Sequence, residues 1–92
     1  MARLEQNEIE QRLSALEGWA REGETIVKRF SCGDFVGSVG LVNRLMPIAE
    51  EMNHHPDLAI SWSTVTVTLA THSEGGLTAA DFELASRIDA LG

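Results

Sequence analysis

The chain has 92 residues, of which 43% are apolar, so it is long enough for one compact domain over residues 1–92 and too apolar for a disordered chain. Its formal net charge is −7, which argues against nucleic-acid binding because that needs a basic face. The polar N-terminus does not resemble a signal peptide, and no apolar run is long enough to span a bilayer.

The first third of the chain predicts a helix followed by a β-hairpin. Residues 5–17 carry an apolar stripe at helical spacing, formed by Ile9, Leu13 and Leu16. Gly18 suits the position just after the helix. Residues 18–31 then read as two strands joined at Gly23, the second of them rich in β-branched residues.

Residues 34–53 predict the main helix, and three features of it are unusual. Its apolar positions cover a wider arc than one contact face needs, so we expect its own sheet and a second subunit to cover it. Gly37 and Gly40 weaken the first half by about 1 kcal/mol each relative to alanine. Pro47 lies well inside the pattern and predicts a kink or a split.

Residues 57–71 predict a second hairpin with its turn at Ser63 and Thr64. The first arm extends to Trp62, and the second alternates between apolar and threonine residues, as in a strand with one buried face.

The last predicted element is a helix that begins after Gly75 and Gly76. Thr78 and Asp81 have the spacing of a capping box at its start, although glutamate is the usual partner. The predicted order is therefore α-β-β-α-β-β-α. We expect an α+β fold, with a four-stranded antiparallel sheet and three helices packed on one face.

The three histidines are the strongest sign of chemistry in the sequence. His54 and His55 follow the long helix, and we expect the second hairpin to bring His72 back to them. Histidine both accepts and donates protons near neutral pH. Pro56 biases His55 towards an extended backbone, so both rings of the pair can face one pocket. Glu50 is placed to bind a ring nitrogen and set its tautomer.

Simpler interpretations stand beside this one. Histidines near a helix end are commonly incidental, and three histidines can also bind zinc, although adjacent ones are poor ligands for one metal. Trp19 and Trp62 are typical core or interface residues, and Asp81 is a typical helix cap. Cys32 has no second cysteine for a disulfide, which fits a reducing cytoplasm, and we interpret it as a packing residue.

These residues together resemble the signature of the pterin-4a-carbinolamine dehydratases, in the pattern Glu50-x3-His54-His55-Pro56-x5-Trp62-x9-His72-x8-Asp81. Further matches occur at Gly18-Trp19, Asp34-Phe35, Thr71-His72 and Gly76-Leu77-Thr78. The resemblance implies removal of water from 4a-hydroxytetrahydrobiopterin to give quinonoid dihydrobiopterin, which a reductase recycles. It also implies a pterin-dependent aromatic amino acid hydroxylase as the pathway partner, and neither a metal nor an organic cofactor.

The resemblance also implies the residues of the site. The expected catalytic residues are His54, His55 and His72, and the expected substrate-binding residues are Trp19, Glu50 and Asp81. Dehydration needs an acid for the leaving oxygen and a base for the proton at the ring nitrogen. We hypothesise that His54 and His72 transfer these protons while His55 binds substrate or assists.

The resemblance further implies a homodimer, or a homotetramer built by pairing the long helices. Pro47 is unexpected in that helix, and the first hairpin loop at residues 22–24 is shorter than in vertebrate members. Two alternatives remain open: a non-catalytic oligomeric module that binds other proteins, and a dehydratase for a related pterin. One vertebrate member is a dimerisation cofactor of a homeodomain transcription factor, but no residue here identifies such a surface.

Overall fold

The computed structural model describes residues 2–91 and has the predicted order of elements. These are α1 (Gln6–Ser14), β1 (Ala20–Glu22), β2 (Thr25–Ser31), α2 (Phe35–Met52), β3 (Asp57–Ser61), β4 (Thr64–Leu69), the 3-10 helix η1 (His72–Glu74) and α3 (Ala79–Asp89). The first helix ends three residues before the predicted end at Glu17. Within residues 2–91, no helix is both long and apolar enough to cross a membrane.

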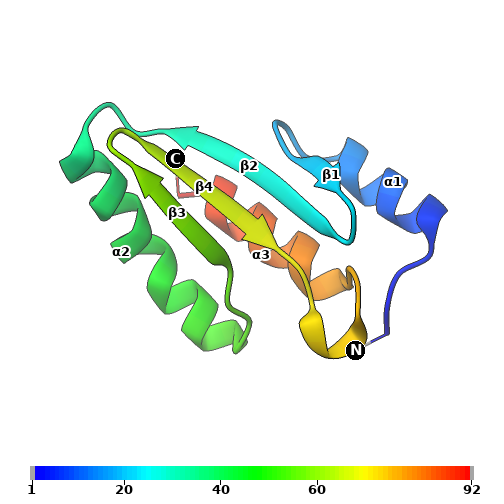
Figure 1. The fold of residues 1–92 in the computed structure, drawn as a ribbon. Coiled ribbons are helices and arrows are strands. Elements are labelled where there is room, and N and C mark those ends of the chain that lie inside the picture. The colour runs from blue at the N-terminus through cyan, green and yellow to red at the C-terminus, as the bar shows by residue number, and fades with distance from the viewer. Residues whose placement is uncertain (1, 92) are drawn as a thin grey trace.

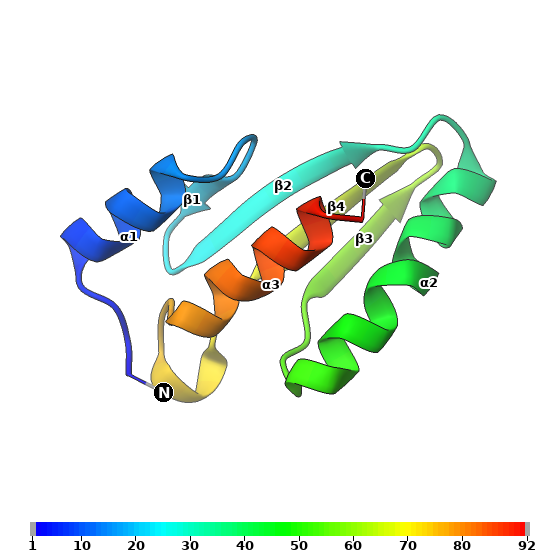
Figure 2. The ribbon, with the colours of Figure 1, turned by 180° about the vertical axis from the view of Figure 1, so that it is seen from behind.

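The four strands form one antiparallel sheet in the order β1-β2-β4-β3. Helices α2 and α3 lie beside each other on one face of the sheet, with α2 against β4 and β3, and α1 lies next to the β1 edge (Figures 1 and 2). This arrangement confirms the predicted α+β architecture. It leaves β3 as an edge strand, and all five of its residues are exposed.

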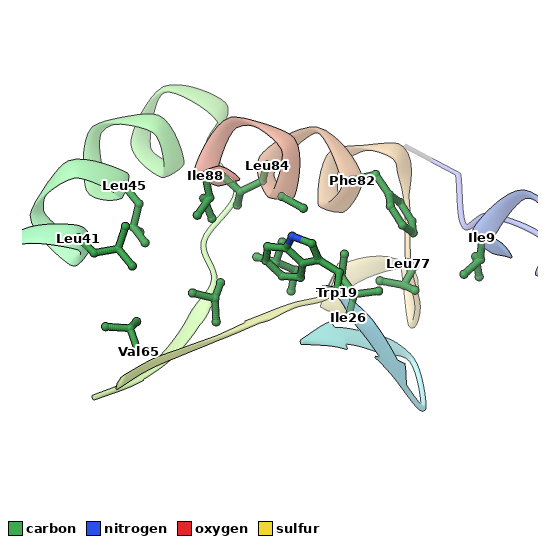
Figure 3. Close-up of a cluster of buried hydrophobic side chains, with 13 residues drawn as sticks. Ile9, Trp19, Ile26, Leu41, Leu45, Val65, Leu77, Phe82, Leu84 and Ile88 are labelled. Atoms are coloured by element: carbon green, nitrogen blue, oxygen red, sulfur yellow. The ribbon is translucent and has the colours of Figure 1, made fainter. Parts of the chain in front are cut away.

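The core lies between the sheet and the helices (Figure 3). On β4, Val65, Val67 and Leu69 are fully buried, and the threonines between them face the open side of the sheet. Leu45 of α2 and Leu84 of α3 are the opposing fully buried side chains. Each such side chain contributes about 1.5–3 kcal/mol through burial, so this layer holds α2 and α3 on the sheet.

Pro47 does not split α2, contrary to one of the two expected outcomes. The helix runs without interruption from Phe35 to Met52. Pro47 has no N–H to donate to the carbonyl of Asn43, four residues earlier. Both residues are exposed, so water can bind that carbonyl and the helix continues.

The two glycines of α2 differ in their surroundings. A Cβ on Gly37 would lie 2.1 Å from the carbonyl oxygen of Cys32, whereas one on Gly40 would meet only the Arg44 side chain, at 3.4 Å. Gly37 therefore allows the start of α2 to pass close to the chain that leaves β2.

The second hairpin turns one residue earlier than predicted. Ser61 pairs with Thr64, so the turn consists of Trp62 and Ser63. Trp62 adopts a left-handed backbone with φ of 50°, which is uncommon for a bulky residue. The buried Ser38 hydroxyl donates to the Trp62 carbonyl at 2.6 Å, and the Cys32 N–H donates to the Ser63 carbonyl at 2.7 Å. These contacts with α2 and the end of β2 hold the turn in place.

Candidate active site

The end of α2 positions the two adjacent histidines. Asn53 follows the helix in a left-handed conformation, and its N–H donates to the Glu50 carbonyl at 3.1 Å. The His54 N–H donates to the Ala49 carbonyl at 3.0 Å. This pair of hydrogen bonds is a Schellman motif, which satisfies the last carbonyls and turns the chain away from the helix axis. His54 and His55 therefore lie just beyond the helix, and Asn53 rather than Pro56 terminates it.

His54 binds a buried carboxylate on the opposite helix. Its Nε2 lies 2.6 Å from Oδ1 of Asp81, whose side chain is fully buried, and the His54 side chain is only 14% exposed. The other Asp81 oxygen accepts hydrogen bonds from the Thr71 hydroxyl at 2.8 Å and the Thr78 N–H at 2.9 Å. Asp81 thus completes the predicted capping box of α3 and also holds His54.

The hydrogen bonds of Asp81 relate the tautomer of His54 to the charge of the carboxylate. Asp81 acts as an acceptor towards Thr71 and Thr78, which fits an ionised carboxylate. An ionised Asp81 requires a proton on Nε2 of His54. In the neutral ring, Nδ1 is then the free acceptor. The arrangement resembles the histidine–aspartate pair of a hydrolase triad, in which the carboxylate fixes the orientation and tautomer of the ring.

His55 has a different environment from its neighbour. Its Nε2 lies 2.5 Å from Oε2 of Glu50, one turn back on α2, and both side chains are more than half exposed. Glu50 therefore orients the ring of His55, not that of His54. An apolar hollow of about 200 Å³ between α2 and β3 borders both residues. The pair combines hydrogen-bonding groups with an apolar surface, as a flat polar heterocycle requires.

His72 lies beyond the end of β4, in the short η1 helix (Figure 1). Its Nε2 is 3.9 Å from Oδ2 of Asp57, the first residue of β3, and both side chains are largely exposed. Asp57 lies two residues after His55, so His72 returns to the same end of the sheet as the histidine pair. The strand stops at Leu69, and therefore the strand alternation does not set the direction of His72.

The two tryptophans of the predicted signature, Trp19 and Trp62, lie in other parts of the fold. Trp19 is buried in the core, and its Nε1 donates to Asp89 at the far end of α3 from Asp81, at 3.0 Å (Figure 3). Trp62 is exposed at the opposite end of β3 from His55. Among residues 2–91, no group of three or more histidine, cysteine or acidic side chains is arranged to hold a metal ion.

The sequence interpretation missed two contributors to this site. Asp57 was not singled out, although its position next to Pro56 brings it to His72. The hydrogen bond that the Thr71 hydroxyl donates to Asp81 was also missed, because the sequence indicated Thr71 only by its position before His72. Asn53 was overlooked as a helix terminator, for which asparagine is a known alternative to glycine.

Comparison with known proteins assigns the chain to a family. Residues 2–91 match the family model described as pterin 4 alpha carbinolamine dehydratase. The chain belongs to this family. A dehydratase-family protein of Sulfolobus acidocaldarius, provisionally named pterin-4-alpha-carbinolamine dehydratase, is 46% identical over 97% of this chain and 98% of its own length. One from Thermosynechococcus vestitus with the same provisional name is 47% identical over 97% of this chain and 94% of its own length.

Solved structures show the same fold. A crystal structure of a transcriptional coactivator/pterin dehydratase from Brucella melitensis superposes with a TM-score of 0.92 at 36% identity, covering 97% of both chains. A pterin dehydratase-like protein identified as a RuBisCO assembly factor in the alpha-carboxysome gives a TM-score of 0.69 at 27% identity. That match covers 82% of this chain and 89% of the other. The pterin dehydratase fold is thus associated with more than one described role.

Proposed function

We propose that this member of the dehydratase family removes water from 4a-hydroxytetrahydrobiopterin to give quinonoid dihydrobiopterin, by histidine acid–base catalysis. The observation that carries the proposal is the contact between His54 and the fully buried Asp81. A buried carboxylate stabilises the protonated imidazole, which is what a base needs at the moment it takes a proton. A helix cap alone has no need of the histidine.

The protons balance as follows. His54 accepts the proton of the ring nitrogen N5 through Nδ1, and the N5–H electron pair forms the double bond between N5 and C4a. The bond between C4a and the hydroxyl oxygen breaks as protonated His72 donates to that oxygen, which leaves as water. Solvent then returns His54 and His72 to their starting states, and no electrons are gained or lost.

His55 and Glu50 serve as substrate-binding groups in this proposal. Their hydrogen bond keeps one His55 nitrogen free for the substrate, beside the apolar hollow that borders both residues. Trp19 stays a prediction as a substrate-binding residue. The contacts that support its role in the core are its hydrogen bond to Asp89 and its edge-to-face packing on Phe30.

We also propose that the protein works as a homo-oligomer in the cytoplasm. The support is an exposed apolar face on α2, β3 and the β3–β4 turn, formed by Phe35, Val36, Met46, Leu58, Ile60 and Trp62. An unprotected edge strand and an uncovered helix face favour association with another copy. The free Cys32 fits a reducing compartment.

The second candidate is a non-catalytic assembly module, because the alpha-carboxysome neighbour is described as a RuBisCO assembly factor. The same exposed apolar face favours it, because that face is available to another protein as well as to a second copy.

A direct assay of carbinolamine dehydration by the purified chain separates the two proposals. The dehydratase accelerates the reaction over the uncatalysed rate, and replacement of His54 by alanine abolishes most of that acceleration. An assembly module gives the uncatalysed rate with either form.

A further inference from the structure

A second hollow lies far from the histidines. It measures about 460 Å³ and is lined by β2, the first half of α2 and the end of α3. This volume falls in the range of small-molecule sites. Arg44 is the lining residue of α2 nearest to His54 in the chain, ten residues before it, which corresponds to about 15 Å along a helix at 1.5 Å per residue. The hollow is therefore separate from the site of the proposed dehydration.

The chain cannot readily fill this hollow with its own side chains. A side chain at Gly37 is unfavourable, because a Cβ there would lie 2.1 Å from the Cys32 carbonyl oxygen. Cys32 contributes only a short side chain next to it. The apolar surface is formed by Phe30, Leu41 and Ile88, so a ring or aliphatic chain entering the hollow would leave water for an apolar environment.

The charges around the hollow are opposite in sign to those of the whole chain. Two of the seven lysine and arginine residues line it, Lys28 and Arg44, against one of the fourteen acidic residues, Asp89. Asp89 already accepts hydrogen bonds from Lys28 at 2.9 Å and from Trp19 at 3.0 Å. Among residues 2–91, no carboxylate lies within ion-pair distance of Arg44.

We propose that this hollow binds a small organic anion with an apolar body. The acidic group pairs with the guanidinium of Arg44, and Lys28 adds positive charge on the β2 side. The ring or chain lies against Phe30, Leu41 and Ile88. Carboxylates and sulfonates fit this description, because arginine binds planar or multi-oxygen anions through paired hydrogen bonds.

The probe for this site is 1-anilinonaphthalene-8-sulfonate, compared with N-phenyl-1-naphthylamine, which has the same rings without the charge. We expect saturable binding of the sulfonate, with the dissociation constant raised about tenfold in Arg44→Gln. The matched control is Arg29→Gln. Arg29 is exposed on β2 next to Lys28 and, by strand alternation, faces the other side of the sheet. It loses the same charge and should bind the sulfonate as the unmodified chain does.

A second readout needs no substitution. Cys32 is the only cysteine and lines the hollow, so intact mass reports its alkylation by iodoacetamide unambiguously. The bound sulfonate should slow that alkylation severalfold, and the neutral compound should have a smaller effect. The proposal is overturned if the sulfonate does not bind saturably or leaves Cys32 equally reactive. It is also overturned if Arg44→Gln and Arg29→Gln have equal effects, since that indicates bulk charge or binding at the exposed α2 and β3 face.

Discussion

Nε2 of His54 lies 2.6 Å from Oδ1 of Asp81, although 27 residues separate them in the chain. The contact joins the end of α2 to the first turn of α3. Two threonines that flank the η1 turn, Thr71 and Thr78, hold the other Asp81 oxygen. One carboxylate thus links the helix cap, the exit of β4 and the candidate base, and the first prediction tests this link.

Replacing Asp81 by asparagine should lower kcat for dehydration by about 10²-fold or more, because the amide cannot stabilise protonated His54. The asparagine oxygen can still accept from the Thr71 hydroxyl and the Thr78 N–H, while its NH2 donates to Nε2 of His54. That hydrogen bond places the ring proton on Nδ1, the atom proposed to accept the substrate proton, and we expect the free energy of unfolding to fall by less than about 1 kcal/mol.

Asp34→Asn is the matched control for Asp81→Asn, measured by the same assay and by urea unfolding. Asp34 caps α2 by accepting from the Gly37 N–H at 2.7 Å and does not contact His54. Because asparagine caps nearly as well, stability and kcat should stay close to those of the unmodified chain. Equal kcat in both variants would remove Asp81 from the proposed mechanism.

His72→Ala should lower kcat by about 10²-fold while leaving the melting temperature unchanged. The loss reflects removal of the proposed acid. The melting temperature should not change because the His72 side chain is 80% exposed and its Nε2 lies 3.9 Å from Oδ2 of the exposed Asp57. Dehydration rates and thermal unfolding of the same preparation measure the change in kcat and the melting temperature. A variant that keeps the full rate would assign the acid to another group.

The sequence predicted the elements of the fold well because their signals are local. The alternation of residues 65–69 and the capping box at Thr78 and Asp81 appear in the structure as expected. The position of the second hairpin's turn was predicted wrongly because contacts from other elements set it. Ser38 donates to the Trp62 carbonyl and the Cys32 N–H donates to the Ser63 carbonyl, and the hairpin's own sequence indicates neither contact.

Ile60→Asp should dissociate the proposed homo-oligomer to a species of 10.0 kDa in sedimentation. Ile60 is exposed on the edge strand, and a charge there disfavours both edge pairing and burial against another copy. The control is Ala20→Asp, which places the same charge on the other edge strand, β1, at an exposed position. If the unmodified chain already sediments at 10.0 kDa, the proposed oligomer is excluded.

The two glycines of α2 should respond oppositely to alanine. Gly40→Ala should raise the free energy of unfolding by about 1 kcal/mol, since alanine is the better helix former and the new Cβ meets only the Arg44 side chain. Gly37→Ala should lower it by about 1–3 kcal/mol, because its Cβ overlaps the Cys32 carbonyl. Urea unfolding of both variants measures the difference. Equal stabilisation would mean that the start of α2 does not pack against Cys32.

The sequence singled out candidate site residues but could not predict how they are arranged. The spacing and chemistry of the histidines singled out His54, His55 and His72. The sequence could not show that Glu50 binds His55 while Asp81 binds His54, because the left-handed backbone of Asn53 sets the direction of each ring. Nor could it show that Trp19 binds Asp89, a contact across 70 residues.

The most direct measurement is the rate of carbinolamine dehydration by His54→Ala relative to the unmodified chain, on protein shown to be folded by circular dichroism. We expect kcat to fall by about 10²–10⁴-fold, the range typical of a lost acid–base group. A His54→Ala chain that dehydrates the carbinolamine at the full rate would contradict this expectation.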